Sequence, residues 1–141
     1  MSKKFIVTAI VTTIVLFVLN AIVYVIFLKD FFQDHPAVSP EFMKQLYRQD
    51  DELIIWAVIL CSLSLGSLVT LVIKWSGART FFSGLRSGFI FAFLFLCSVD
   101  LGLLASTNNF TIAGAFADIF CSTATVTLAS AIAAWMLGRG K

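Results

Sequence analysis

Four long apolar runs, separated by shorter polar stretches, dominate the sequence. They cover residues 5–28, 53–73, 87–104 and 112–137. A helix needs about 20 apolar residues, within a range of about 17–25, to cross about 30 Å of hydrocarbon. Backbone groups inside lipid must also bond within their own segment, which favours helices. The pattern therefore predicts four transmembrane helices.

Composition supports the membrane class. Hydrophobic residues make up 60% of the 141 residues and charged residues only 13%, whereas soluble domains hold about half apolar and about a quarter charged residues. A barrel of strands is disfavoured, because its segments are about ten residues long with alternating polarity. We expect residues 1–141 to form one all-α domain, an integral membrane four-helix bundle. The net charge of +2 gives no reason to expect a nucleic-acid partner.

The distribution of Lys and Arg predicts the orientation. Seven of the ten fall in the N-terminus, the connection between the second and third runs, and the C-terminus, and three fall in residues 29–52. By the positive-inside rule both termini are then cytoplasmic. The first run is longer than the apolar stretch of about 7–15 residues in a signal peptide, so we interpret it as an uncleaved helix.

The connection after the first run contains a further helix signal. Ser39 is a suitable cap and Pro40 suits the first helical position. Phe42 and Leu46 are one turn apart and share a face. We predict a helix over residues 40–52 that continues into the second span as an outer extension. The alternatives are a bend that lays the helix on the membrane surface, and a docking face for a partner.

Small residues predict where helices approach one another. Gly84 and Gly88 form a G-x-x-x-G at the start of the third span, a spacing that permits close helix contact. Small and hydroxyl residues also recur in the second and fourth spans, at Ser62, Ser64, Gly66, Ser67 and Thr70 and at Ser122, Thr123, Thr125, Thr127 and Ser130. We expect them to serve helix packing, with a hydrophilic path for a solute as the alternative.

Two acids lie inside the predicted spans, Asp100 in the third and Asp118 in the fourth. An acid inside the membrane costs about 2.5–3.5 kcal/mol and marks a candidate functional site. The helical rise places both acids about 9–10 Å below the outer ends of antiparallel neighbours, and Asn20 about 12 Å below that of the first span. The three side chains form a candidate intramembrane polar site. It is either a proton relay or cation site, or a set of hydrogen-bonded groups that closes the bundle.

Three cysteines fall at a similar depth. Cys97 precedes Asp100 by three residues and Cys121 follows Asp118 by three, so each pair shares a helix face. Cys61 lies near this layer in the second span. Because thiolates select soft metals, the three thiols are a candidate metal site. No other cofactor is expected, since the spans lack the histidines of a haem site and the chain lacks Cys-x-x-Cys.

Several features of the sequence are similar to those of one group of membrane proteins. Tyr24 with Phe31 and Phe32 at the end of the first helix, Gly84 and Gly88, and the acid-containing fourth helix are similar to small bacterial four-helix integral membrane proteins of unknown function. The resemblance extends over most of the chain. It implies a multi-pass protein of the bacterial inner membrane and no particular activity.

The chain is small and has no catalytic motif, so we expect a protein that is not an enzyme. The first hypothesis is an accessory subunit of a larger membrane complex, or a structural homo-oligomer. An alternative is a small dimeric transporter or channel for an ion or small solute that uses Asp100 and Asp118. A third is a membrane-embedded enzyme or a metal- or lipid-binding protein. The expected partners are the lipid bilayer and a membrane protein or a second copy of the chain.

Overall fold

The computed structural model describes residues 2–48 and 52–139, and the regular elements within them are helical. In chain order they are α1 (Lys3–Val23), the π-helical turn η1 (Tyr24–Leu28), α2 (Lys29–Asp34), α3 (Pro40–Leu46), α4 (Ile55–Trp75), α5 (Phe81–Ser106) and α6 (Ile112–Gly138). The prediction of an all-α chain is confirmed for these residues.

Four helices of the described chain are long and apolar enough to cross a membrane. They are α4, α5, α6 and the continuous run Lys3–Asp34, which joins α1, η1 and α2. Their positions agree with the four apolar runs of the sequence. By the length and composition of its helices, the chain is a multi-pass integral membrane protein.

Two helices extend beyond the predicted spans for local reasons. The first continues to Asp34 because Gly and Pro are absent until Pro36, and a helix usually ends by the residue before a proline. The third begins at Phe81 because the Thr80 hydroxyl accepts a hydrogen bond from the Ser83 amide, while the Ser83 hydroxyl bonds back to the Thr80 amide. Such a capping box satisfies amides that the first turn of a helix leaves free.

The outer connection is only partly as predicted. α3 forms, with the Ser39 hydroxyl accepting a hydrogen bond from the Phe42 amide at 3.4 Å. Its predicted continuation into the second span is wrong, because Tyr47 is extended and Ile54 is not helical. Residues 49–51 of the predicted helix lie outside the described residues. Glu52 precedes the first residue of α4 by three positions, where the positive end of a helix favours an acid, so it suits the start of a new helix.

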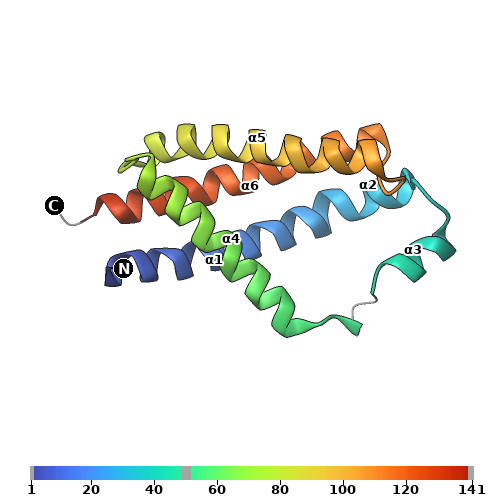
Figure 1. The fold of residues 1–141 in the computed structure, drawn as a ribbon, viewed down its shortest axis with the longest axis horizontal. Coiled ribbons are helices and arrows are strands. Elements are labelled where there is room, and N and C mark those ends of the chain that lie inside the picture. The colour runs from blue at the N-terminus through green and yellow to red at the C-terminus, as the bar shows by residue number, and fades with distance from the viewer. Residues whose placement is uncertain (1, 49–51, 140–141) are drawn as a thin grey trace.

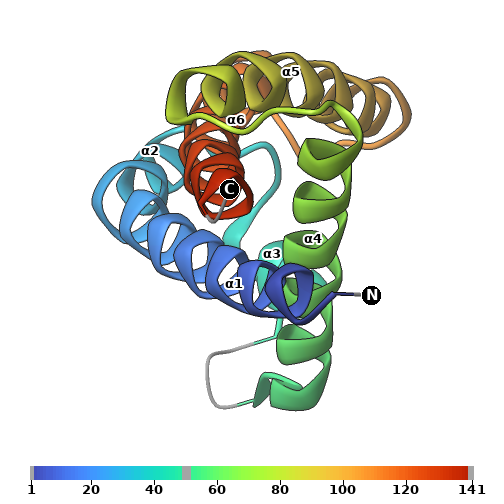
Figure 2. The ribbon, with the colours of Figure 1, turned by 90° about the vertical axis from the view of Figure 1, so that its left-hand side faces the viewer.

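α6 is the central helix of the molecule. It contacts α5, α1 and α4, and Figure 2 shows it between α5 and α1. Half of its most apolar stretch is buried, against 17% for each of the other three spans. α5 and α6 run antiparallel and lie side by side, as the short turn between them predicts (Figure 1). The two helices approach closely at Gly84 and Gly88, so the predicted contact at the G-x-x-x-G is confirmed.

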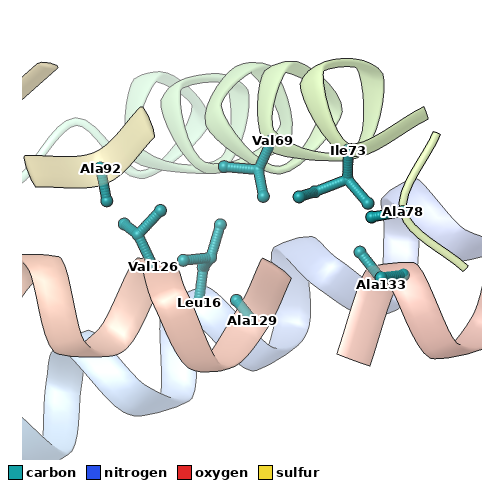
Figure 3. Close-up of a cluster of buried hydrophobic side chains, with 9 residues drawn as sticks. Leu16, Val69, Ile73, Ala78, Ala92, Val126, Ala129 and Ala133 are labelled. Atoms are coloured by element: carbon teal, nitrogen blue, oxygen red, sulfur yellow. The ribbon is translucent and has the colours of Figure 1, made fainter. Parts of the chain in front are cut away.

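The apolar core is built from small and branched side chains of four helices. Val69 and Ile73 of α4 point toward Val126 and Ala133 of α6, with Leu16 of α1 beside them (Figure 3). Because lipid tails are as apolar as these side chains, close van der Waals packing rather than exclusion from water holds such helices together.

α4 diverges from the arrangement of a regular bundle. It crosses α1 at Gly66, where an added Cβ would lie 2.8 Å from the backbone N and Cα of Thr13. Its buried residues are Gly66 and three that follow it, and none of residues 55–65 is buried. Figure 1 shows α4 running diagonally away from the other three long helices. The end of α4 that begins at Ile55 therefore stands apart.

Basic side chains gather at one end of the molecule. α1 begins, α6 ends and α4 joins α5 at one end, while α3 and the α5–α6 turn lie at the other (Figure 1). At the first end the Lys4 ammonium donates a hydrogen bond to the carbonyl of Arg139, and the Lys74 ammonium lies 5.3 Å from the Phe5 ring centroid. Basic side chains therefore cluster where the two termini and the second connection meet.

Candidate intramembrane acid site

The structure brings Asp100 and Asp118 together. Because α5 and α6 are antiparallel neighbours, both acids lie near the end of the molecule that holds the α5–α6 turn. Gly84 and Gly88 of α5 lie against Ala134 and Ser130 of α6, and the same antiparallel register places Asp100 level with Asp118. Asp100 is buried, with 4% of its surface exposed, whereas Asp118 is partly exposed. The two acids therefore form a pair with one buried and one accessible member.

The two carboxyl groups differ in their hydrogen bonds. Asp118 Oδ1 accepts a hydrogen bond of 3.0 Å from the Ser122 hydroxyl, one turn further along α6. Asp100 Oδ2 is buried, and the described residues provide no hydrogen-bond partner for it. A buried polar atom without a partner costs about 1–3 kcal/mol, and more when it is charged. Asp100 is therefore the least satisfied member of the site.

Asn20 joins the same polar layer from α1. Its Oδ1 lies 3.1 Å from the Thr125 hydroxyl of α6, and that hydroxyl also lies 2.9 Å from the Ser122 carbonyl. Asp118, Ser122 and Thr125 are spaced i, i+4 and i+7, which places them along one face of α6. Ser122 and Thr125 were predicted to serve helix packing, with a hydrophilic path for a solute as the alternative. Their helical spacing from Asp118 was the signal for their part in this layer.

The three cysteines do not form a common site in the structure. All are free thiols, with Cys97 and Cys121 partly buried and Cys61 exposed on the diverging part of α4. Within residues 2–48 and 52–139, no group of three or more His, Cys, Asp or Glu side chains is close enough to hold a metal ion. Cys61 was predicted at the depth of the other two cysteines, but it lies apart from them because α4 diverges from α5 and α6.

A cavity of about 660 Å³ opens onto Asp118. It lies between α2, α3 and the α5–α6 turn, and Asp118 forms part of its wall. Its other polar and charged lining includes Tyr24, Gln33, His35, Lys44, Tyr47, Arg48 and Asn109. Asp118 is therefore accessible from the cavity, whereas the buried Asp100 does not line it.

A second hollow, of about 300 Å³, lies between α1 and the diverging α4. Asn20 and Ser62 line it from opposite sides, and Tyr24 lines both this hollow and the larger cavity. The polar layer is therefore accessible at two places, at Asp118 from the α3 end and at Asn20 beside α4.

Comparison of the chain with protein-family models, with curated proteins and with solved structures finds no match. The resemblance to small bacterial four-helix membrane proteins therefore stays a prediction. What the arrangement can do is decided by its own chemistry. Paired carboxylates can hold a positive charge, and an amide and hydroxyls can bond across helices.

Proposed function

We propose that this chain is a non-catalytic component of a membrane assembly, either an accessory subunit of a larger complex or a homo-oligomer. The observation that carries the proposal is the sparsely packed first half of α4, in which none of residues 55–65 is buried and only Leu65 packs partly against the core. The assembly belongs to a bacterial inner membrane. The cluster of basic residues at the end that holds both termini supports a cytoplasmic position for that end.

The polar groups beside α4 give the physical reason for a partner. Asn20 uses its amide oxygen toward Thr125, and the described part of the chain provides no bond for its two N–H donors. Amides in the hydrocarbon region bond across helix interfaces, because lipid offers no acceptor there. The hollow between Asn20 and Ser62 is where another helix would supply such an acceptor.

The face of α3 is a further feature that suits a partner. Phe42 and Leu46 are 48% and 46% exposed on a short helix outside the long spans. Exposed apolar side chains on one face of a helix either lie on the membrane surface or dock a partner. Both uses place α3 at the boundary of an assembly rather than in the core of this chain.

Native mass spectrometry from mild detergent tests the proposal, since it measures the stoichiometry of the chain and of co-purified partners. We expect a defined oligomer or complex for the wild-type chain, and its weakening by Ser62→Trp, which fills the hollow beside Asn20. Leu94→Trp on an exposed part of α5 is the matched control and should leave assembly unchanged. A stable monomer that by itself moves a solute across liposomes would contradict the proposal.

A second candidate function is a small dimeric transporter or channel for an ion or small solute. It is favoured by the position of Asp118 in the wall of the 660 Å³ cavity, with the buried Asp100 on the neighbouring helix. Liposome flux that falls strongly with Asp100→Asn or Asp118→Asn supports this candidate. Flux that is unchanged in both variants excludes a path through the acid pair.

A further inference from the structure

Asp100 combines two properties that rarely occur together in a stable site. Only 4% of its surface is exposed, and its Oδ2 has no hydrogen-bond partner among the described residues. A carboxylate in the hydrocarbon region with an unused oxygen is costly, and such acids usually pair with another group or take up a positive charge. Asp100 Oδ2 therefore needs a partner or a positive charge.

Asp118 lies level with Asp100 on the neighbouring helix, and it brings a second negative charge rather than a compensating one. Two carboxylates that share an apolar site cannot both remain charged without a cation between them. The Ser122 hydroxyl, bonded to Asp118, adds a neutral oxygen to the group. Oxygen ligands of this kind suit a proton or a hard cation and not a soft metal.

We propose that Asp100 and Asp118 form a binding site for one small monovalent cation, a proton or Na⁺, which enters through the cavity beside α3. Asp118 is the accessible ligand at the cavity wall, and Asp100 is the buried ligand on the neighbouring helix. A proton and Na⁺ would be bound in the same way, as one positive charge held between two carboxyl groups. The site deepens the transport alternative, but it requires binding only and is independent of the subunit proposal.

The titratable groups around Asp100 and Asp118 do not neutralise the two acids within the described part of the chain. The Cys97 thiol lies three residues before Asp100 on α5, and the Cys121 thiol three residues after Asp118 on α6; both are free and partly buried. The remaining titratable and charged groups line the cavity from η1, the α2–α3 connection, α3 and the residues after it: Tyr24, His35, Lys44, Tyr47 and Arg48. Ion pairs between these bases and Asp100 or Asp118 are absent among the described residues, so the compensating charge has to come from outside the chain.

Carbodiimide labelling of the purified full chain in detergent tests the site, because the reagent reacts with protonated carboxyl groups in apolar surroundings. Peptide mass spectrometry locates the label on Asp100 or Asp118. We expect labelling of one acid per chain that is lost as the pH rises, since the reagent needs the single proton that the two carboxyl groups share. Asp118→Asn should shift the pH profile of labelling at Asp100, and Asp34→Asn, which changes an exposed acid of α2, should not.

A second arm separates the two cations. Na⁺ replaces N-methylglucamine at constant ionic strength while the pH is held fixed. Protection from labelling by Na⁺ assigns the site to Na⁺, and an unchanged profile with pH-dependent labelling assigns it to the proton. Either result supports the site. Absence of label on both acids at every pH overturns it, as does independent labelling of both acids with profiles that the partner substitution does not change.

Infrared spectroscopy of the wild-type chain provides a measurement that needs no substitution and therefore no assumption about the folding of variants. Aspartates labelled with ¹³C shift the carbonyl band of a protonated carboxyl away from those of glutamate. We expect such a band in the absence of Na⁺, and its disappearance when Na⁺ or alkali removes the shared proton. Its absence throughout overturns the proposal and leaves the subunit proposal standing.

Discussion

Replacing Gly84 by Ala should destabilise the chain, because α5 and α6 have no room for a methyl group at this point. An added Cβ would lie 2.5 Å from Ala134 Cβ and 2.8 Å from both Ala131 Cα and the Ser130 carbonyl oxygen. Two of these atoms belong to the backbone and cannot move by a change of rotamer. Reaching an ordinary contact of 3.4 Å requires the helices to separate by about 0.6 Å along the backbone contacts.

The expected loss is about 1–3 kcal/mol, the usual cost of inserting a methylene into a packed site. Gly102→Ala is the matched control, since it makes the same substitution in the same helix where nothing lies within 4 Å of the new Cβ. The control should be neutral or more stable by about 0.5–1 kcal/mol, because Ala favours a helix over Gly. Reversible unfolding in bicelles measures both free energies. Equal stabilities for the two variants would refute the assigned packing of α5 against α6.

Three other measurements give independent tests. Ser39→Ala removes the oxygen that caps α3, and the loss of about 1 kcal/mol should make the backbone amides of α3 exchange about fivefold faster in deuterated buffer; unchanged exchange contradicts the cap. A double-mutant cycle of Asn20→Leu and Thr125→Val should give a coupling of about 0.6 kcal/mol, the average for interhelical hydrogen bonds in a membrane. A coupling of zero would show that this bond does not join α1 to α6. Reporters inserted in the α2–α3 connection and the α5–α6 turn should read as external, and those in the α4–α5 connection as cytoplasmic; the opposite pattern refutes the orientation.

Properties that depend on neighbours along the chain were predictable from the sequence. The four apolar runs correspond to the four long helices, because a membrane-spanning helix must satisfy its own backbone and needs a continuous apolar stretch. Ser39 and Pro40 start α3 as their local chemistry predicts. Gly84 and Gly88 mark the close approach of α5 and α6, since residues four apart share a face.

For the candidate site, the sequence predicted the depth of each residue but not its lateral position. The rise of a helix gives the depth of each residue, and depth grouped Asp100 with Asp118, which the structure brings together. The same argument grouped Cys61 with the other cysteines, and the structure places it on the diverging part of α4. Depth does not determine the lateral position of a residue or the face on which it lies.

Only the tertiary structure decided these lateral relations. The tilt of α4 is set by its crossing with α1 at Gly66 and Thr13, two residues far apart in the sequence. That crossing leaves residues 55–65 without buried positions and opens the hollow beside Asn20. The end of α3 at Tyr47 likewise separates it from α4 although no Gly or Pro occurs there. Hydropathy and helix propensity act along the chain, whereas these features depend on which small side chains of different helices meet.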